Sequence, residues 1–371
     1  MTLPPARTGS APRPTLLLTG GAGVLGHALI DELAADHELV CLRRRNPVGD
    51  PRVREIAGDL LAPGLGLTPA ERAELADRVD VVLHCAAETD WRRTPGEIRR
   101  ANVSGTRALL AFAERAEAPF HYVSTAFVAA ELRDRDRERF PGAAAYLESK
   151  RAAEQAVREA PVPGVILRPA LLLGDSHTGR SSGTRGLVQA LGSLVLGRIP
   201  VLPGDARTRV DLVPQDHVAR AAAGLIRAGV TGGDYWLTAG PQALPLGEAV
   251  ELCLDFAVAQ GLVRPAPPRL VREEVAHRLL RPVPGGIPAT LPTRARFHHR
   301  AELFLAFRDA PAFETSFGPP DCGPAVTRDG VRAALVRNLR TWAESRSRLL
   351  AASRTPIPAP VRVGAVRESA T

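Results

Sequence analysis

The sequence is short of several residue types that carry chemistry in other proteins. Its 371 residues include a single lysine, Lys150, although lysine and arginine together number 48. Aromatic residues make up 4% of the chain, and only three of them are tyrosines. One of those tyrosines, Tyr146, stands four positions before the lysine. Since arginine supplies all the other basic side chains, Lys150 is expected to meet a requirement that arginine does not.

Cysteine is scarce, and its spacing argues against metal and redox chemistry. The four cysteines are Cys41, Cys85, Cys253 and Cys322, with no CxxC pair among them. Cys41 and Cys85 lie in apolar, strand-like runs, which favours buried, reduced thiols in a cytoplasmic protein. Cys85 as an acyl-accepting nucleophile would need a paired histidine or acid, and none is evident, so a small packed residue is favoured. No metal site is predicted.

Long apolar runs are missing as well. No stretch reaches the roughly 18 apolar residues of a membrane span. The first residues, MTLPPARTGSAPRP, lack the apolar core of a signal peptide. We expect residues 1–14 and 353–371, rich in proline, glycine, serine and arginine, to be disordered tails.

The net charge is +8 and the isoelectric point about 10.2. The arginines are spread along the chain and are not clustered with aromatic residues. A general preference for arginine over lysine is therefore favoured over nucleic-acid binding, and no nucleic-acid partner is predicted. An anionic ligand such as a phosphate-bearing cofactor stays compatible with this charge.

Apolar runs alternate with segments of helical period along the first half of the chain. Strands are expected at 15–20, 38–43, 53–60, 79–87, 119–127 and 164–174. Helices are expected at 24–36, 97–116 and 143–159. Continuous Val, Leu and Ile strands separated by helices are typical of a parallel sheet buried on both faces. The predicted fold class is α/β, a doubly wound Rossmann-type sheet.

The pattern loosens after Gly174. Residues 175–186 are expected to form a loop, 187–197 an apolar helix, 209–229 a strand, turn and helix, and 234–240 another strand. From 241 onward, helices are interrupted by proline-rich joints. We predict a core at 15–175 and a smaller, mostly helical substrate lobe at 176–352, with about 209–240 returning to the core.

A glycine-rich turn separates the first strand from the first helix. The stretch TLLLTGGAGVLGHAL carries Gly20, Gly23 and Gly26 with GxxGxxG spacing, directly after Thr19. Such glycines allow a tight turn and close approach of backbone N–H groups to a pyrophosphate at the helix N-terminus. The strand-and-helix context predicts dinucleotide binding, although a glycine turn without function remains the alternative.

The end of the second predicted strand bears on which dinucleotide is bound. An acidic residue there would accept bonds from the ribose of NAD, but the strand ends in Arg43, Arg44 and Arg45. Guanidinium groups suit a 2′-phosphate, so NADP(H) is predicted; a solvated arginine run is the alternative. Asp59 is placed to bind the adenine amino group or simply to cap a turn.

Tyr146 and Lys150 are four residues apart and share one face of the helix expected at 143–159. An ammonium near the phenol is expected to lower the tyrosine pKa toward the working range of a proton donor. Ser124 and Thr125 end the fifth predicted strand, where parallel strands meet a ligand crevice. A hydroxyl there can hold a carbonyl oxygen as it gains charge.

These residues together resemble an extended short-chain dehydrogenase/reductase. The resemblance is closest to the fatty acyl-CoA reductase and thioester reductase branch, with its male-sterility-type NAD-binding domain. It is carried by TGGAGVLG, CLRRR, HCAAETDW, NVSGT, HYVSTAFV, YLESK, ILRPALLLGDSHTG and DLVPQDHVA, in family order from about residue 15 to 219. The glycine turn and YxxxK identify only the superfamily.

The resemblance implies roles for particular residues. Thr125, with Ser124 beside it, would be the catalytic hydroxyl residue, Tyr146 the proton donor, and Lys150 the ribose-binding partner of Tyr146. The implied cofactor-binding set is Thr19, Gly20, Gly23, Val24, Leu25, Gly26, Arg43, Arg44, Asp59, Leu60, Cys85, Ala86, Ala87, Asn102, Lys150, Arg168 and Pro169.

The resemblance implies NADPH-dependent reduction of an acyl thioester, small or carrier-bound, to an aldehyde or alcohol. One alternative is an extended relative acting on a sugar nucleotide, sterol or other ketone or alcohol. A sugar nucleotide would need a diphosphate grip, for which Arg180, Arg185, Arg207 and Arg209 are candidates. A non-catalytic NADP-sensing regulator is a third alternative, although such relatives typically lack the Tyr/Lys pair.

The chain departs from the family in its C-terminal part. Residues 241–350 resemble the family's tail only faintly, in FLAFRDAPAFETSFG, which leaves the acyl specificity open. No adenylation or carrier domain is evident in the sequence, so an acyl substrate is expected to arrive already activated. The helices at 97–116 and 143–159 are of the kind that pairs across a homodimer in such folds.

Overall fold

Seven parallel strands form the central sheet of this chain. The computed structural model describes residues 13–131, 133–182, 187–271, 275 and 312–347. The sheet order is β11-β6-β5-β4-β1-β2-β3. The bounds are β1 (Thr15–Thr19), β2 (Glu38–Arg43), β3 (Val53–Ala57), β4 (Val81–His84), β5 (Phe120–Val123), β6 (Gly164–Pro169) and β11 (Gly233–Leu237). The predicted doubly wound α/β fold is confirmed.

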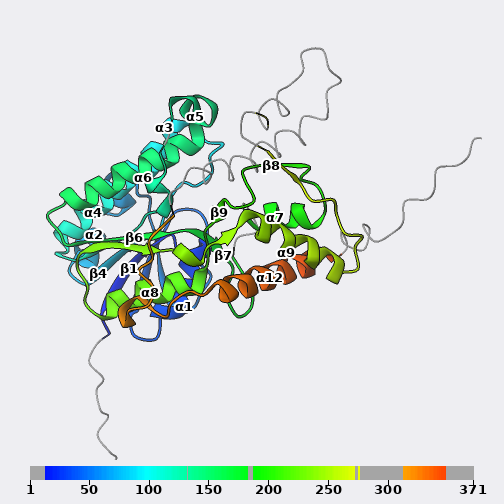
Figure 1. Cartoon of the computed structure of the whole chain (residues 1–371). Helices are drawn as coiled ribbons and strands as arrows, with labels where there is room; N and C mark the ends of the chain where they lie inside the picture. Colours follow the sequence, from blue (N-terminus) through cyan, green and yellow to red (C-terminus); the bar gives the residue numbers. More distant parts are fainter. Residues whose placement is uncertain (1–12, 132, 183–186, 272–274, 276–311, 348–371) are drawn as a thin grey trace, which may run out of the picture.

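Helices cover both faces of the sheet because its strands are apolar on both sides (Figure 1). Leu17 of β1 packs into the core beneath the helices α2 (Pro69–Ala76), α4 (Gly105–Arg115) and α6 (Pro141–Glu159). Its neighbours Leu16 and Leu18 pack on the opposite face, which holds α1 (Val24–Leu33) and α8 (Gln215–Arg227). Alternate side chains of one strand thus enter two separate cores.

Two predicted elements are interrupted. The segment expected to be one strand at 164–174 divides after Pro169, and β7 (Leu171–Leu173) pairs with β10 (Leu212–Pro214) instead of continuing in the main sheet. The helix expected at 97–116 consists of α3 (Pro95–Arg99), a π-helical turn, η2 (Arg100–Ser104), and α4. A π turn inserts one extra residue per turn, which the apolar period does not reveal.

Within the described residues, the chain after Gly174 forms α8, three further helices and several short strand pairs. The helices α7 (Leu187–Val195), α9 (Leu246–Ala259) and α12 (Arg328–Ser345) pack together (Figure 1). β9 (Arg209–Val210) pairs with β12 (Leu244–Pro245), and β8 (Val201–Pro203) with β13 (Arg269–Val271). β11 joins the main sheet beside β6, and α8 packs on α1. The predicted division at 175/176 remains a prediction.

The remaining short elements are α5 (Asp134–Arg139) and the 3-10 turns η1 (Pro63–Gly66), η3 (Ala126–Ala129), η4 (Gly240–Gln242) and η5 (Pro320–Cys322). The predicted tails fall outside the described residues, apart from Arg13 and Pro14. So do the proline-rich joint at 281–292 and the first half of the FLAFRDAPAFETSFG stretch. Within the described part of the chain, every helix is too short or too polar to cross a membrane.

Candidate active site

The glycine turn brings three backbone segments into close contact at the carboxyl end of β1. Gly20 has φ +79°, and a Cβ atom there would lie 2.6 Å from the backbone nitrogen of Ala86. A Cβ atom on Gly26 would overlap the carbonyl oxygen of Gly20. Gly23 precedes the first residue of α1 and has no side chain to cap it. The first N–H groups of α1 therefore face an open site suited to an anion.

A cavity of about 640 Å³ opens above this turn and runs along the carboxyl ends of the strands. All four predicted catalytic residues line it, and so does every predicted cofactor residue except Gly26, Asn102 and Arg168. The residues that prediction missed are Gly21, Ala22, Cys41, Leu42, Asn46, Gly58, Leu61, Glu88, Thr89, Ala101, Val123, Ala170 and Leu172. Most of these are chain neighbours of predicted residues, so they follow once the strand ends are known.

The arginine run after β2 divides into two parts. Nε of Arg43 lies 2.9 Å from Oε2 of Glu55 on the neighbouring strand, so this guanidinium already forms an ion pair with a carboxylate. Arg44 and Arg45 also line the cavity, and neither forms an ion pair with any described carboxylate. Asp59 accepts a hydrogen bond from the N–H of Leu61 at 2.9 Å, a turn-closing contact, and lines the same end of the cavity.

Lys150 is 2% exposed, on the face of α6 that covers the sheet. Its Nζ donates a hydrogen bond to the carbonyl of Val123 at 2.8 Å and lies 4.8 Å from the ring centre of Tyr122. Burial lowers the pKa of Lys150 to about 8, while Cys85 and Glu154 act in the opposite direction. The ammonium is thus held in a narrow slot at the end of β5.

The pKa of Tyr146 moves opposite to the direction expected from its neighbour Lys150. Burial raises it to about 12, although part of the ring remains exposed, and a hydrogen bond from the hydroxyl of Thr125 opposes this rise. The expectation of a lowered pKa was wrong because removal of the phenol from water outweighs the favourable contacts. Tyr146 is therefore a protonated hydrogen-bond donor at neutral pH, next to the hydroxyl of Thr125.

Ser124 and Thr125 are adjacent, but their hydroxyls have different partners. Oγ of Ser124 donates to Oε1 of Glu154 at 2.6 Å. The hydroxyl of Thr125 accepts from the N–H of Phe127 at 3.4 Å. Among the described contacts of this pair, only the hydroxyl of Ser124 is bound to a carboxylate.

Arg168 does not line the cavity, contrary to its expected place beside the nicotinamide. Its guanidinium makes a two-pronged contact with Glu154, at 3.0 and 2.7 Å, and lies 2.7 Å from Asp234. It also lies 4.6 Å from the ring of Trp236. Arginine forks match carboxylates well, so the buried Glu154 and the side chain of Asp234 keep this guanidinium away from the cavity.

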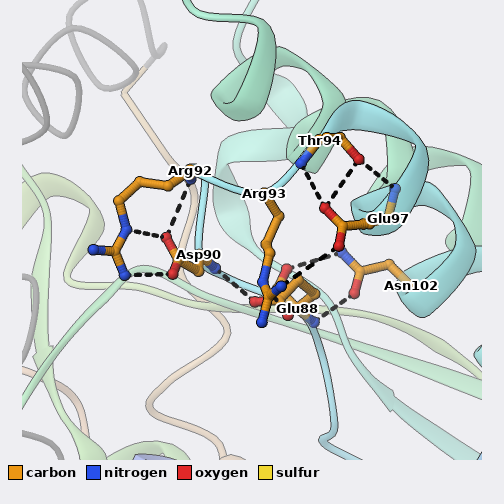
Figure 2. A network of polar contacts seen from close by, with 7 residues as sticks. All are labelled: Glu88, Asp90, Arg92, Arg93, Thr94, Glu97 and Asn102. Carbon is orange, nitrogen blue, oxygen red and sulfur yellow. Dashed lines mark hydrogen bonds and ion pairs between the residues drawn. The ribbon is translucent and has the colours of Figure 1, made fainter.

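Asn102 also lies outside the cavity and anchors one of its walls. The side chain accepts from the N–H of Glu88 at 2.7 Å and donates to the carbonyl of Glu88 at 3.1 Å. It donates as well to Oγ of Ser149 on α6, at 2.9 Å. Figure 2 shows the loop that begins at Glu88. This loop ends in the capping box of Thr94 and Glu97 at the start of α3.

A buried histidine that the sequence did not single out connects β1 with the first turn of α4. Nδ1 of His84 lies 2.6 Å from Oγ1 of Thr19, and Nε2 lies 3.0 Å from Oγ1 of Thr106. Since Thr106 donates its own proton to the carbonyl of Asn102, it accepts from Nε2–H, which leaves Nδ1 to accept from Thr19. Burial, aided by the charge of Lys150, lowers the pKa of His84 to about 3. The ring is neutral and serves as a fixed link.

Aromatic side chains gather beside Tyr146 in a chain that has few of them. The ring of Trp91 lies 6.1 Å from that of Tyr146, centre to centre. Phe313 stacks on Trp236 at 5.9 Å and meets Phe127 edge-on at 5.4 Å. These residues form one apolar cluster with Leu147 and Leu171. The tyrosine end of the cavity is therefore bordered by an apolar wall.

The candidate diphosphate grip is not assembled at the cavity. Arg209 donates to the carbonyls of Pro241 and Ala243, and neither it, Arg180 nor Arg207 lines the cavity. Arg185 lies outside the described residues. In the described part of the chain, no group of three or more His, Cys, Asp or Glu side chains is arranged to hold a metal ion.

Comparison with known proteins finds relatives for part of this chain, and the chain spans only a small share of the curated relatives it matches. Residues 46–222 match the family model described as male sterility protein, an NAD-binding domain. The hybrid PKS-NRPS synthetase poxE of Penicillium oxalicum is 31% identical over 232 residues, which cover 56% of this chain and 6% of that protein. Glycine betaine reductase ATRR of Emericella nidulans is 30% identical over 251 residues, covering 56% of this chain and 19% of ATRR.

Solved structures extend the match to most of the chain. The terminal R domain from the myxalamid PKS-NRPS pathway superposes with a TM-score of 0.67 and 25% identity, covering 91% of this chain and 92% of that one. DesIV, a dTDP-glucose 4,6-dehydratase from Streptomyces venezuelae with NAD and TYD bound, has a TM-score of 0.62 at 21% identity, which shows a shared fold. This superposition covers 90% of this chain and 98% of the DesIV chain. Residues 46–222 thus resemble a male-sterility-type NAD-binding domain, and most of the chain is similar to a terminal reductase (R) domain of a PKS-NRPS pathway.

Proposed function

We propose that this protein uses NADPH to reduce an acyl thioester, CoA-bound or carrier-bound, to an aldehyde or alcohol. The observation that carries the proposal is that the hydroxyl-bearing side chains of Thr125 and Tyr146 line the same cavity as the glycine turn and Lys150. Both are uncharged donors, suited to a carbonyl oxygen that becomes negative during reduction. The similarity to PKS-NRPS terminal reductase domains supports the thioester as substrate.

The lining of the cavity supports a nicotinamide dinucleotide as its ligand. The close contacts of Gly20 and Gly26 leave no room for side chains where a pyrophosphate would meet the first N–H groups of α1. Arg44 and Arg45 would bind the 2′-phosphate, since Arg43 is paired with Glu55. Lys150 would bind the nicotinamide ribose. When bound, the cofactor supplies the hydride.

The protein residues would act on the carbonyl oxygen. Hydride addition to the thioester carbon places a negative charge on that oxygen, and the hydroxyls of Thr125 and Tyr146 would donate hydrogen bonds to it. Collapse of the intermediate breaks the C–S bond, and the thiolate leaves to take up a proton. The raised pKa of Tyr146 suits this role, because a phenol with a pKa of about 12 stays protonated at neutral pH. Reduction of the aldehyde to an alcohol would use the same donors and a second hydride.

The test is the oxidation of NADPH against a panel of acyl-CoAs, acyl-pantetheine thioesters, aldehydes, ketones and sugar nucleotides, followed by the absorbance of the reduced nicotinamide. We expect turnover with thioesters, and a fall in kcat of about three orders of magnitude in Tyr146→Phe with unchanged NADPH binding. Turnover confined to sugar nucleotides would refute the thioester assignment. Better turnover with NADH than with NADPH would refute the role of the arginines.

A further inference from the structure

A buried carboxylate lies one helical turn beyond Lys150. Glu154 is 3% exposed and sits on the same face of α6 as Tyr146 and Lys150, because the three are spaced four residues apart. Carboxylates are seldom buried to this degree unless charged or hydrogen-bonded partners compensate them. The YxxxK motif of Tyr146 and Lys150 does not explain why a third residue, Glu154, is buried on this face.

The partners of Glu154 come from two strands and its own helix. It accepts hydrogen bonds from Ser124, just after β5, at 2.6 Å and from Arg168 on β6 at 3.0 and 2.7 Å. Arg158, one turn further along α6, reaches it at 3.1 Å. One carboxylate therefore joins α6 to the ends of the two strands that border the cavity.

The two arginines around Glu154 do not give this group of side chains an excess of positive charge. Arg158 and Arg168 each lie 2.7 Å from the same carboxylate oxygen of Asp234 on β11. Two guanidinium groups thus face two carboxylates, and this cluster is close to neutral as a whole. A buried, two-pronged arginine contact also fixes the direction in which the carboxylate points.

Among the described residues, no carboxylate lies within ion-pair distance of Lys150, whose Nζ bonds to the backbone carbonyl of Val123. The titratable groups that surround it come from α6, β5 and the end of β4, and are Tyr146, Glu154, Tyr122, His84 and Cys85. The two phenols, the thiol and the neutral imidazole carry no charge at neutral pH. Of these groups, only Glu154 is negative.

We propose that Glu154 is a positioning residue of the active site, which holds Ser124 and Arg168 against α6 and keeps the arginine–carboxylate cluster next to the Lys150 ammonium neutral, so that no further positive charge faces that ammonium. The hydroxyl of Ser124 then serves this contact, and Thr125 is left as the hydroxyl that meets the substrate. The proposal rests on the proposed function only for the place of Lys150 beside a nicotinamide ribose.

The chain offers a direct measurement because Lys150 is its one lysine. Protein labelled with ¹⁵N and ¹³C in lysine alone gives a single side-chain signal, whose shift against pH reports the pKa of Lys150 without substrate or cofactor. In Glu154→Gln, which keeps the shape and removes the charge, we expect this pKa to fall by about one unit. The affinity for NADP⁺ should fall as Lys150 loses its proton, and the pH at which it falls should decrease by the same amount.

The matched control is Glu159→Gln on the same helix. Glu159 is exposed and accepts only a bond from Gln155 among its described contacts, so the titration of Lys150 should not change. A structural role for Glu154 would lower the thermal stability of Glu154→Gln without moving the lysine titration, and an unmoved titration would overturn the proposal.

Should Glu154→Gln fail to fold, Glu154→Asp carries the test, because it keeps the charge. The pKa of Lys150 should then stay within about half a unit of its wild-type value, while NADP⁺ affinity weakens through the shortened reach to Ser124 and Arg168. A fall of a full unit in that variant would also overturn the proposal. Neither readout requires thioester turnover, so a failed substrate panel leaves the result on Glu154 standing.

Discussion

The contacts of Lys150 explain why one lysine persists in a chain that otherwise uses arginine. Its ammonium ends in a slot between the carbonyl of Val123 and the ring face of Tyr122, with 2% of the residue exposed. A compact point charge fits this space and still has N–H groups to offer a ribose. A guanidinium is a wide planar fork whose five N–H groups would need more acceptors than the slot provides.

Lys150→Arg should therefore abolish most of the activity although the charge is kept. We expect kcat/KM with NADPH and a thioester to fall at least about 100-fold, because the larger head group displaces the ribose and the Tyr146 hydroxyl. Steady-state kinetics and NADPH titration would measure this. Arg107→Lys, at an exposed position on α4, is the matched exchange and should change neither quantity. More than half of the wild-type activity in Lys150→Arg would show that any cation suffices.

At the scale of single elements, local patterns predicted the strands well because each strand carries its own apolar run. They failed where a strand changes partners. The N–H of Ala170 bonds to the carbonyl of Leu237, and the next N–H, of Leu171, bonds to Asp211. The run at 164–174 is equally apolar on both sides of this point, and the second set of partners lies about 40 residues further along the chain. Only the folded sheet reveals that β6 and β7 are separate.

The same limit applies to the site. The glycine turn, the arginine run and the Tyr/Lys pair are local motifs, and their residues line one cavity. Ser124 and Arg168 also belong to recognisable motifs, yet their partner is Glu154, 30 and 14 residues away in sequence. Whether a hydroxyl or a guanidinium is free to bind a ligand depends on such distant partners. Motifs alone therefore could not show that Ser124 and Arg168 are already bound to another side chain.

The contact between α1 and the glycine turn makes a prediction about Gly26. Alanine there would place its Cβ against the carbonyl of Gly20, and backbone atoms cannot move aside as a side chain would. We expect Gly26→Ala to lose about 3 kcal/mol of unfolding free energy and to bind NADP⁺ at least about tenfold more weakly. Urea unfolding and fluorescence titration would measure the two effects.

Gly96→Ala in α3 is the control for that substitution. A Cβ atom at Gly96 would meet no atom within 4 Å, and alanine favours a helix. Its stability should be unchanged or slightly higher, with NADP⁺ affinity unaffected. Equal behaviour of the two variants would mean that the close approach of α1 to the turn is not needed for cofactor binding.

On the scale of the whole molecule, the last described helix closes over a loop that begins beside the cavity. Side chains of α12 donate to three carbonyls of the segment 176–179: Arg337 to Ser176 at 2.9 Å, Thr341 to Thr178 at 3.0 Å and Asn338 to Gly179 at 2.9 Å. This segment follows β7, whose Leu172 lines the cavity. α12 thus holds a loop that lies about 160 residues earlier in the chain, and it packs with α7 and α9 (Figure 1).

If α12 and the sheet form one cooperative unit, Asn338→Ala should weaken both together. Asn338 is 2% exposed, and its loss leaves the buried carbonyl of Gly179 without its donor, a cost of about 2 kcal/mol. We expect one urea transition, seen alike by circular dichroism and tryptophan fluorescence, at a lower midpoint with an unchanged slope. Arg340→Ala, exposed on the same helix, should leave the midpoint in place. Two separate transitions in Asn338→Ala would show that the C-terminal lobe unfolds without the sheet, and the contacts of α12 would then order the loop without stabilising the core.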